Sequence, residues 1–322
     1  TSKGCPVSSD DRLGVFEMFR GKSIQQFSAI CCLFIPIVPN QPHTQRRVVR
    51  QIDAVEAERL IRIEPVQILD VRTPKEFTTL GHIPDAKLTP LDLIASAPAV
   101  LALDKPVLVY CEHGIRSKVA AEFLLQAGFN NVVNMVGGMS GWRHDRSYEP
   151  QTIAGPAPWL RDHVEIDCNG RALDVASGRG RHALLLAALG WHVRAVDRDE
   201  RAINELQTIA NRLALNLVAN VVDLESGRVD LGRECYDLIV VTRYLHRPLF
   251  EMLIDAVSLG GVLFYETFMS GQERFGEPTN PDFLLMPGEL RTLVAPLEII
   301  KQREGLFDGQ MISSVIARKT IR

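Results

Sequence analysis

The sequence predicts an α/β chain with two domains, each built around a sheet of mostly parallel strands. Short apolar runs typical of buried strands alternate with segments of helical periodicity, which is the pattern of a parallel sheet. A stretch rich in proline and glycine, from Ser147 to Pro158, divides this alternation into two series. The second series holds seven strand-like runs, and no helix separates the last two, so we expect its sheet to end in an antiparallel pair.

The composition and charge narrow the class of protein. Of the 322 residues, 46% are hydrophobic and 23% are charged, which is typical of a globular chain long enough for two ordinary domains. A formal net charge of -3 gives no reason to expect nucleic acid or an anionic membrane as a partner. The six cysteines are too sparse for a disulfide framework and include no Cys-x-x-Cys pair, so we expect a reducing, cytoplasmic setting and no metal site.

Residues 1–45 are expected to form a poorly ordered extension. The apolar stretch from Ile24 to Val38 is interrupted by polar residues, and it is shorter than a membrane span of about 20 apolar residues. A signal peptide is the alternative, because Arg20 and Lys22 precede this stretch. The expected divisions that follow are a first domain over residues 46–146, a linker over 147–160 and a second domain over 161–322.

The first domain begins with a helix and then alternates strands with helices. Asp53 is placed to cap the first helix, Thr73 followed by Pro74 marks the start of another, and Gly128 ends a third. The expected elements are a helix through Ala54, Ala57 and Ile61, a strand Val66–Asp70, a short helix from Pro74, a strand Val107–Tyr110, a helix Lys118–Ala127 and a strand Asn131–Met135.

The second domain repeats this alternation and then closes with a hairpin. Gly190 ends its first helix, and Gly305 and Gly309 lie between its last two strands. The expected helices are Arg181–Leu189 and Arg201–Leu213. The expected strands are Arg171–Val175, His192–Val196, Leu217–Val222, Leu238–Val241, Val262–Tyr265, Leu297–Arg303 and Met311–Arg318.

Cys111 follows the strand Val107–Tyr110 directly, in a tight loop that leads into a helix. Such a turn points consecutive backbone N–H groups at one place and so forms a cradle for an anion. The positive end of the helix dipole and the charge of Arg116 both favour the thiolate over the thiol. A buried structural cysteine is the alternative, but a glycine and an arginine at fixed offsets after a strand favour a nucleophile.

The segment from Val107 to Ser117 resembles the active-site loop of the rhodanese sulfurtransferases. This resemblance extends over about residues 47–145, because further motifs of that family occur in order. They are Ile68-Leu69-Asp70-Val71-Arg72, Glu76-Phe77, Gly81-His82-Ile83-Pro84-Asp85-Ala86, and Gly137-Gly138 followed by Trp142. The resemblance implies that Cys111 accepts a sulfane sulfur as a persulfide, while the loop N–H groups and Arg116 hold an anionic donor such as thiosulfate.

The length of the loop argues against a related activity. The pattern here is Cys-x4-Arg, whereas related phosphatases use Cys-x5-Arg, whose wider loop admits phosphate. We expect Asp70 and Arg72 to stabilise the fold rather than to take part in catalysis. Glu112 and His113 lie in the loop, where they either influence the choice of donor or face solvent.

A second turn between a strand and a helix follows Asp174. Small residues at positions 176, 177, 178 and 180 allow a ligand to approach the backbone closely. A glycine-rich turn alone fits a dinucleotide as well as a nucleoside. Asp174 distinguishes the two, because a carboxylate would repel a pyrophosphate but tolerate a cofactor that carries an ammonium and a sulfonium group. Asp197 ends the next strand, about 20 residues on, where an acid accepts hydrogen bonds from ribose hydroxyls.

This pattern resembles motif I of the class I methyltransferases over about residues 160–320, and Tyr236–Val240 and Gly260–Leu263 match later motifs. The resemblance implies a Rossmann-like fold and S-adenosylmethionine as cofactor. Ala176 replaces the usual first glycine, a position that also varies among sequences of the tellurite-resistance type. The expected cofactor-binding residues are Asp174, Ala176, Gly178 and Gly180 in the turn, Asp197 for the ribose and Asp223 for the adenine. Capping a helix or turn is the alternative role of Asp197 and Asp223.

The methyl acceptor leaves a weaker signal. Methyltransferases acting on the amines of bases usually carry Asn-Pro-Pro-Tyr after the fourth strand, and this chain has Val241-Thr242-Arg243-Tyr244 there. We expect Arg243, Tyr244 and His246 to lie near the acceptor, with His246 either as a general base or as a simple polar contact. The segment from Phe275 to Pro287 is expected to be a loop that covers this site.

The two resemblances together imply a bifunctional transferase. One activity transfers a methyl group to a small-molecule acceptor, and the other transfers sulfur through Cys111 to a small molecule or a protein acceptor. The alternative is a methyltransferase whose first domain is a non-catalytic module that senses sulfur or binds a partner. A chemical coupling of the two sites, in which sulfur from Cys111 is methylated, rests only on their presence in one chain.

Overall fold

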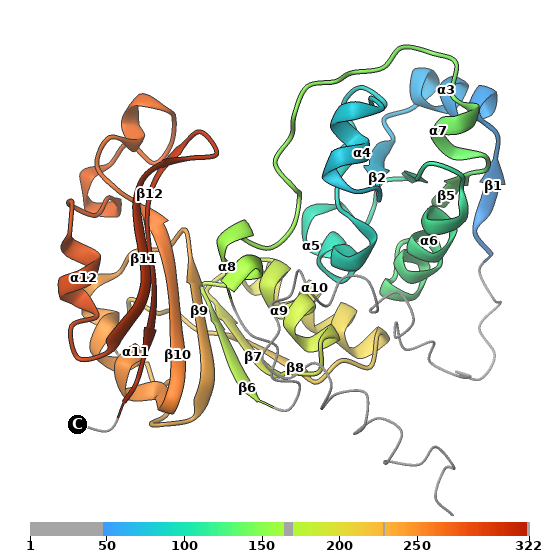
Figure 1. The fold of residues 1–322 in the computed structure, drawn as a ribbon. Helices are drawn as coiled ribbons and strands as arrows, with labels where there is room; N and C mark the ends of the chain where they lie inside the picture. The colour runs from blue at the N-terminus through green and yellow to red at the C-terminus, as the bar shows by residue number, and fades with distance from the viewer. Residues whose placement is uncertain (1–47, 164–169, 228, 321–322) are drawn as a thin grey trace, which may run out of the picture.

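The computed structural model describes residues 48–163, 170–227 and 229–320 (Figure 1). The expected N-terminal extension, residues 1–45, lies outside this part of the chain. The expected fold class is confirmed, because an all-parallel sheet is followed by a second, mostly parallel sheet that ends in an antiparallel pair. No helix within the described residues has the length and apolar character needed to span a membrane.

The first sheet has five parallel strands in the order β1-β5-β4-β2-β3. Its strands are β1 (Arg50–Ile52), β2 (Gln67–Asp70), β3 (Lys87–Leu88), β4 (Val107–Tyr110) and β5 (Val132–Met135). Its helices are α3 (Ala54–Ile63), α4 (Pro74–Thr79), the 3-10 turn η2 (Leu91–Ser96), α5 (Ala97–Val100), α6 (Ile115–Ala127) and α7 (Gly138–Gly141). The strand β4 is buried along its whole length, so it carries Cys111 into the centre of the domain.

The helix boundaries follow from local chemistry that the sequence displays. The side chain of Asp53 accepts a hydrogen bond from the backbone N–H of Glu56 and caps α3. Thr73 and Glu76 form a reciprocal capping box at the start of α4. Gly128 adopts a left-handed conformation with φ of 110° and ends α6.

The second sheet has seven strands in the order β11-β12-β10-β9-β6-β7-β8. Its strands are β6 (Arg171–Val175), β7 (His192–Asp197), β8 (Leu217–Val221), β9 (Tyr236–Thr242), β10 (Val257–Phe268), β11 (Glu298–Phe307) and β12 (Gln310–Arg318). The chain builds outward from β6 to β8 and then crosses back to β9 on the other side of β6. This reversal opens a crevice at the carboxyl ends of β6 and β9, where ligands bind in such sheets.

Helices cover both faces of the second sheet. They are α8 (Pro158–His163), α9 (Arg181–Ala188), α10 (Glu200–Arg212), α11 (Phe250–Ala256), α12 (Glu289–Leu293) and the 3-10 turns η3 (Arg247–Leu249), η4 (Gln272–Arg274) and η5 (Pro281–Phe283). The helices α9 and α10 belong to one apolar cluster, and α11 and α12 belong to another. The sheet therefore lies between two packed layers.

Several elements differ from the sequence-based expectations. The strands β1 and β3, the helical segment Leu91–Val100 and the short helices α7 and α8 were not expected, because they are too short to show a periodicity. The helix α6 begins at Ile115, three residues before the expected start at Lys118. The strand β10 is longer than expected at its N-terminal end, where its pairing with β9 shifts register between Val257 and Val262.

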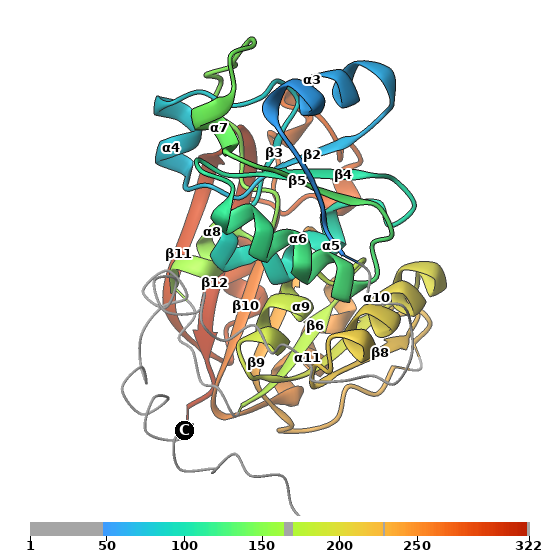
Figure 2. The ribbon, with the colours of Figure 1, turned by 90° about the vertical axis from the view of Figure 1, so that its right-hand side faces the viewer.

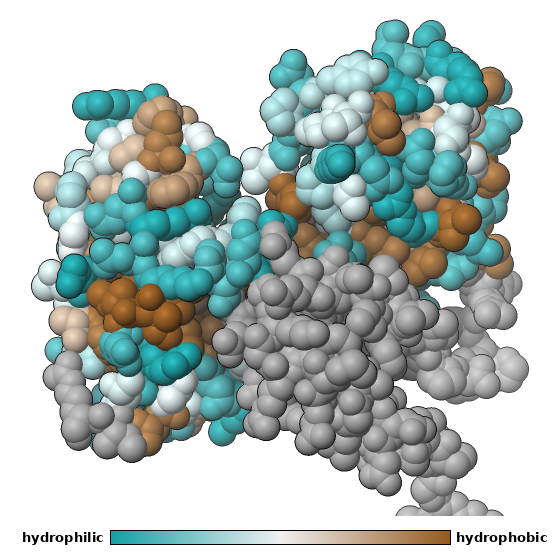
Figure 3. Space-filling model, in the orientation of Figure 1, coloured by the Kyte–Doolittle hydropathy of each residue, from teal (hydrophilic) through white to brown (hydrophobic). Residues whose placement is uncertain are grey.

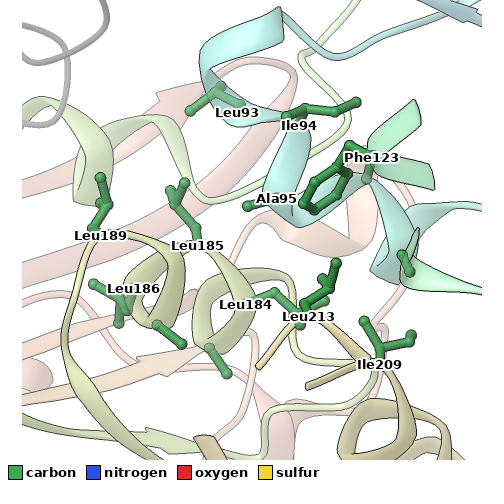
Figure 4. Packing of buried hydrophobic residues seen from close by; sticks show 14 of the residues in the cluster. Leu93, Ile94, Ala95, Phe123, Leu184, Leu185, Leu186, Leu189, Ile209 and Leu213 are labelled. Carbon is green, nitrogen blue, oxygen red and sulfur yellow. The ribbon is translucent and has the colours of Figure 1, made fainter. Parts of the chain in front are cut away.

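The two domains share one hydrophobic core. Figures 1 and 2 show η2, α5 and α6 of the first domain lying against α9 and α10 of the second. Figure 4 shows Leu93, Ile94 and Phe123 facing Leu184 and Leu185 across this contact, and these buried residues belong to a single cluster. In Figure 3 the visible face of the first domain is mostly hydrophilic, and its apolar residues gather along its lower edge. The domains are therefore docked through side chains that are removed from water.

Candidate active sites

Cys111 lies at the carboxyl end of β4, in a loop whose N–H groups converge on its sulfur. The sulfur is buried and accepts hydrogen bonds from the backbone N–H of Gly114 at 3.1 Å and from the hydroxyl of Ser117 at 3.4 Å. Gly114 has φ of 84° and precedes the first turn of α6, so the loop can turn sharply into the helix. These donors surround the sulfur at the position where the sequence predicts an anion cradle.

The thiol of Cys111 is shifted toward its ionised form. Burial alone raises its pKa, but hydrogen bonds from Ser117, His113 and Gly114 outweigh this effect and leave the pKa below its ordinary value. A lower pKa increases the fraction of thiolate, which is the nucleophilic form of a cysteine.

Arg116 does not stand free beside Cys111. Its guanidinium forms two hydrogen bonds with the carboxylate of Glu76 on α4, and this interaction lowers the pKa of Glu76 to about 2. The thiolate of Cys111 also raises the pKa of Arg116, after the larger effect of Glu76. The arginine is therefore shared between a fixed carboxylate and the sulfur site.

The helix α7 closes the back of the Cys111 loop. The N–H groups of Met139 and Ser140 donate to the carbonyl oxygens of Cys111 and Glu112, at 2.9 and 3.0 Å. This approach requires Gly138, because a Cβ atom there would lie 2.2 Å from the carbonyl oxygen of Cys111. Close packing of two backbones thus explains Gly138, while Gly137 adopts the left-handed region with φ of 76°.

A fully buried ion pair between Asp70 and Arg72 packs against the Cys111 loop. Arg72 donates to both carboxylate oxygens of Asp70, to the carbonyl oxygen of Gly81 and to Glu112. Asp70 and Arg72 therefore connect β2, the segment before β3 and the Cys111 loop. Glu112 faces this arginine rather than solvent, while His113 is exposed and contacts Ser140.

The second candidate site is a cavity of about 670 Å³ at the carboxyl edge of the larger sheet. This volume falls within the range of small-molecule pockets, about 300–1,000 Å³. Its walls come from the ends of five strands and from the segment that contains η5. The lining residues are Ala176, Asp197, Arg198, Val222, Asp223, Leu224, Glu225, Arg243, Tyr244, Leu245, Thr267, Phe268, Glu277, Pro278, Thr279, Asn280 and Phe283. None of these residues belongs to the first domain.

The glycine turn after β6 is attached to the acid at the end of β7. The backbone N–H of Gly178 donates to Asp197 at 2.7 Å, and the N–H of Ser177 donates to the carbonyl oxygen of Val196 at 3.0 Å. The hydroxyl of Ser177 is buried without a hydrogen-bond partner among the described residues. Asp223 lines the cavity from the end of β8, so Ala176, Asp197 and Asp223 are brought together as the sequence predicts.

Asp174 lies behind the turn instead of on the cavity wall. Its carboxylate is almost completely buried, accepts a hydrogen bond from the N–H of Ala183, and lies 3.9 Å from the imidazole of His182. Burial raises the pKa of Asp174 to about 7. Gly178 and Gly180 shape the turn with φ of 53° and 78° but, like Asp174, are not among the lining residues.

The expected acceptor residues divide into two groups. Arg243 and Tyr244 line the cavity, and the hydroxyl of Tyr244 donates to Glu225 at 3.4 Å. Arg243 adopts the left-handed region with φ of 55° and donates to Gln310. His246 lies two residues beyond Tyr244, before η3, and does not line the cavity. The segment Glu277–Asn280 does line it, where the sequence predicts a covering loop.

Sequence reasoning missed several residues of both sites. Arg198 follows Asp197 directly, and Glu225 follows Asp223 by two positions. Their closeness in sequence to the expected cofactor-binding acids could have identified them as lining residues. Glu76 was noted as part of a motif, but its pairing with Arg116 joins residues 40 positions apart and leaves no local pattern. Within the described residues, no group of three histidines, cysteines or acids is arranged to hold a metal ion.

Comparisons with known proteins divide the chain in the same way. The model of the rhodanese-like domain matches residues 53–145, and the model of the tellurite resistance protein TehB matches residues 157–308. A sulfurtransferase of Allochromatium vinosum is 38% identical over 99 residues, which cover 30% of this chain and 92% of that protein. The thiosulfate sulfurtransferase GlpE of Pseudomonas aeruginosa is 35% identical over 104 residues, which cover 32% of this chain and 92% of that protein.

Among the solved structures that are similar to this chain is one of a TehB protein. TehB from Haemophilus influenzae is 23% identical, covers 47% of this chain and 58% of its own length, and gives a TM-score of 0.41. This chain thus spans less than two thirds of that protein. Residues 157–308 match the model of the tellurite resistance protein TehB, and through residues 53–145, which match the sulfurtransferase of Allochromatium vinosum, the chain belongs to the rhodanese-like family.

Proposed function

We propose that the chain is a transferase with two separate sites. Cys111 takes up sulfane sulfur from an anionic donor such as thiosulfate, and the second domain transfers the methyl group of S-adenosylmethionine to a small-molecule acceptor. The observation that carries the proposal is the contrast between the two sites. One is a cysteine sulfur surrounded by N–H and O–H donors, and the other is a cavity with the carboxylates of Asp197, Asp223 and Glu225 on its wall.

The geometry of the first site supports the following sulfur step. The thiolate of Cys111 attacks the outer sulfur of thiosulfate and forms a new S–S bond, while the original S–S bond breaks and sulfite leaves with its electron pair. The N–H groups that point at the site stabilise the negative charge during this step. A second nucleophile, cyanide or a thiolate, then takes the outer sulfur and restores the thiolate of Cys111.

The residues of the second site fit S-adenosylmethionine. Asp197 ends β7 and Asp223 follows the end of the neighbouring β8 by two residues, where carboxylates accept hydrogen bonds from a ribose and an adenine amine. The unpartnered hydroxyl of Ser177 is a further polar group beside the turn. When bound, this cofactor supplies an electrophilic methyl group on a sulfonium. The carboxylates of the wall favour its positive charge.

The acceptor is proposed to bind between the end of β9 and the segment Glu277–Asn280. Arg198 and Arg243 bring positive charge to a wall that is otherwise acidic, so this region can receive an anionic nucleophile. The family matched by the second domain is named for tellurite resistance. Oxyanions and hydrides of sulfur, selenium and tellurium are therefore the first acceptors to test.

The two sites are formed by different domains. Cys111 follows β4 of the first domain, whereas all the residues that line the cavity belong to the second domain. A chemical coupling of the two sites, in which sulfur from Cys111 is methylated, therefore stays separate from this proposal.

The pairing of Arg116 with Glu76 supports an alternative for the first domain. If this carboxylate keeps the arginine from the donor, the domain senses sulfur or binds a partner without turning over thiosulfate. Mass spectrometry after incubation with thiosulfate distinguishes these roles. An added sulfur atom on Cys111 supports the enzyme, and an unmodified cysteine supports the binding module.

A reciprocal pair of variants tests the proposed function. Cys111→Ala is expected to abolish thiosulfate:cyanide sulfurtransfer and to leave the affinity for S-adenosylmethionine unchanged. Asp197→Ala is expected to weaken that affinity by about 10-fold or more, because a carboxylate that accepts ribose hydrogen bonds is lost, and to leave sulfurtransfer unchanged. Calorimetric titration and a thiocyanate assay measure both effects in each variant.

Two control variants show whether the effects of Cys111→Ala and Asp197→Ala are specific to these positions. Cys235→Ala alters the other free cysteine of the described chain and is expected to keep both activities. Asp230→Ala alters an acid that only caps a turn outside the cavity and is expected to bind the cofactor normally. Sulfurtransfer retained by Cys111→Ala, or full affinity in Asp197→Ala, would each refute one half of the proposal.

A further inference from the structure

The glycine turn of the second domain is anchored on the first domain. Arg179 stands between Gly178 and Gly180, and its guanidinium donates to the carbonyl oxygens of Leu101 at 2.7 Å and Pro98 at 3.2 Å. These carbonyls lie at the C-terminal end of α5, where backbone acceptors have no partner within the helix and carry partial negative charge. The same side chain also pairs with Glu205 of α10 at 3.5 Å.

The residues that follow Arg179 are held by the linker. Arg181 donates to the carbonyl oxygen of Gly155 at 3.4 Å, and the imidazole Nε2 of His182 accepts a hydrogen bond from the N–H of Ala157 at 3.1 Å. Burial lowers the pKa of His182 well below its ordinary value, so its ring is neutral and can accept this bond. Figure 1 shows this part of the linker descending to α8 beside the second sheet.

The linker is itself attached to the first domain. The N–H of Ala154 donates to the carbonyl oxygen of Leu88 on β3 at 2.8 Å, and the hydroxyl of Thr89 donates to the carbonyl oxygen of Ala154 at 2.6 Å. Three of the four positions from Arg179 to His182 are therefore bonded either to the first domain or to a segment that this domain holds.

The same turn sets the position of the acid that lines the cavity. Gly178, one residue before Arg179, donates its N–H to Asp197, and Ser177 donates to Val196. A shift of the turn would therefore change the hydrogen bonds of Asp197 and the shape of the wall next to Ala176.

We propose that Arg179 is a positioning residue through which the rhodanese-like domain holds the glycine turn in the conformation that binds S-adenosylmethionine. The inference rests on the proposed function, because it concerns the same cofactor. An arginine suits this task, because its Nη2 donates to both carbonyls while its Nε faces Glu205, and the group remains charged at every physiological pH. Affinity for the cofactor then becomes a property of both domains together.

The test measures binding of S-adenosylhomocysteine to the full chain by calorimetry. Arg179→Ala is expected to weaken binding by about 10-fold, since hydrogen bonds from a charged donor that fix the turn are lost. Arg179→Lys, which keeps the charge and can reach one carbonyl, is expected to restore part of this loss. Arg201→Ala is the matched control, because Arg201 pairs with the same Glu205 and is highly exposed.

A second ligand separates positioning from direct contact. Methylthioadenosine lacks the amino acid part of the cofactor but keeps the adenosine that Asp197 would bind. Because the turn positions Asp197, Arg179→Ala is expected to weaken binding of both ligands by a similar factor, while thiosulfate:cyanide sulfurtransfer stays unchanged. A loss confined to S-adenosylhomocysteine would make Arg179 a direct ligand of its carboxylate and overturn the proposal.

Two other results also decide the question. Unchanged affinity of Arg179→Ala for both ligands, or an equal loss in Arg201→Ala, refutes the role of the interdomain contact. Failure of the unaltered chain to bind either ligand refutes the proposed cofactor first and removes the basis of this inference with it.

Discussion

The pKa of an acidic side chain in this protein depends on its burial as well as on its residue type. Asp174 and Asp197 are both acids of the second sheet, yet one is sealed behind the turn and the other lines the cavity. Asp174 has one hydrogen-bond donor, the N–H of Ala183, and Arg181 lowers its pKa by less than burial raises it. A carboxylate in this position is expensive to ionise.

The raised pKa of Asp174 predicts how stability depends on pH. Its ordinary value is 3.8 and its value in the fold is about 7, so its contribution to stability is complete below about pH 4 and is lost as the pH rises through about 7. Asp174→Asn keeps an oxygen for Ala183 and removes the charge. The variant is therefore expected to be more stable than the unaltered chain at pH 8, by at most about 4 kcal/mol, and similar to it near pH 4.

Urea unfolding at several pH values measures this difference. Asp237→Asn is the control, because Asp237 also accepts a backbone N–H, from Arg171, but is exposed. A stability difference for Asp174→Asn that does not change between pH 4 and pH 8 would show that this acid is not the titrating group.

At the scale of elements, the turn between β6 and α9 is constrained at two glycines, for different reasons. Gly180 adopts φ of 78°, and a Cβ atom there would lie 2.5 Å from the side chain of the buried Leu206 on α10. Gly178 adopts φ of 53°, but a Cβ atom there would meet nothing within 4 Å. A side chain at Gly178 would thus meet backbone strain alone, whereas a side chain at Gly180 would meet both backbone strain and a steric clash.

Alanine at each position is expected to destabilise the chain by different amounts. Gly178→Ala should cost about 1 kcal/mol, because only the left-handed conformation is penalised. Gly180→Ala should cost about 2–4 kcal/mol, because Leu206 must also move. Chemical denaturation of both variants under the same conditions tests this order, and equal losses would mean that α10 yields without cost.

The sequence predicts these elements well where the determinants are local. The caps at Asp53, Thr73 and Gly128 and the strand ending in Asp70 appear as expected, since each depends on residues a few positions apart. His246 is not among the residues that line the cavity, since this part of the lining ends at Leu245 and η3 begins at Arg247. The hydrogen bond from Arg179 to Leu101 joins residues 78 positions apart, and no local pattern in the sequence predicts it.

At the scale of the whole molecule, the shared core predicts that the two domains unfold together. Calorimetric heating of the full chain is expected to give a single transition, since α9 and α10 lose their apolar cover when the first domain opens. Two variants separate this shared core from the core of one domain. Phe123 lies in the shared cluster, and Phe77 lies in a cluster formed by the first domain alone.

Both phenylalanine-to-alanine changes are expected to cost about 3 kcal/mol or more. Phe77→Ala should move the single transition to a lower temperature without dividing it. Phe123→Ala should broaden or split it, because the cavity lies at the contact that couples the domains. Two resolved transitions in the unaltered chain would contradict a common unfolding unit.

The continuous packing between the domains has a consequence for how such a chain can be divided or recombined. The match to one family model ends at residue 145, and the match to the other begins at residue 157. Cutting the chain between these residues would nevertheless not give two independently folded domains. A fragment that begins at residue 157 would expose the leucines of α9 to water and leave Arg179 without its two carbonyls. Exchanging either module for a relative would therefore require a new complementary surface on the other.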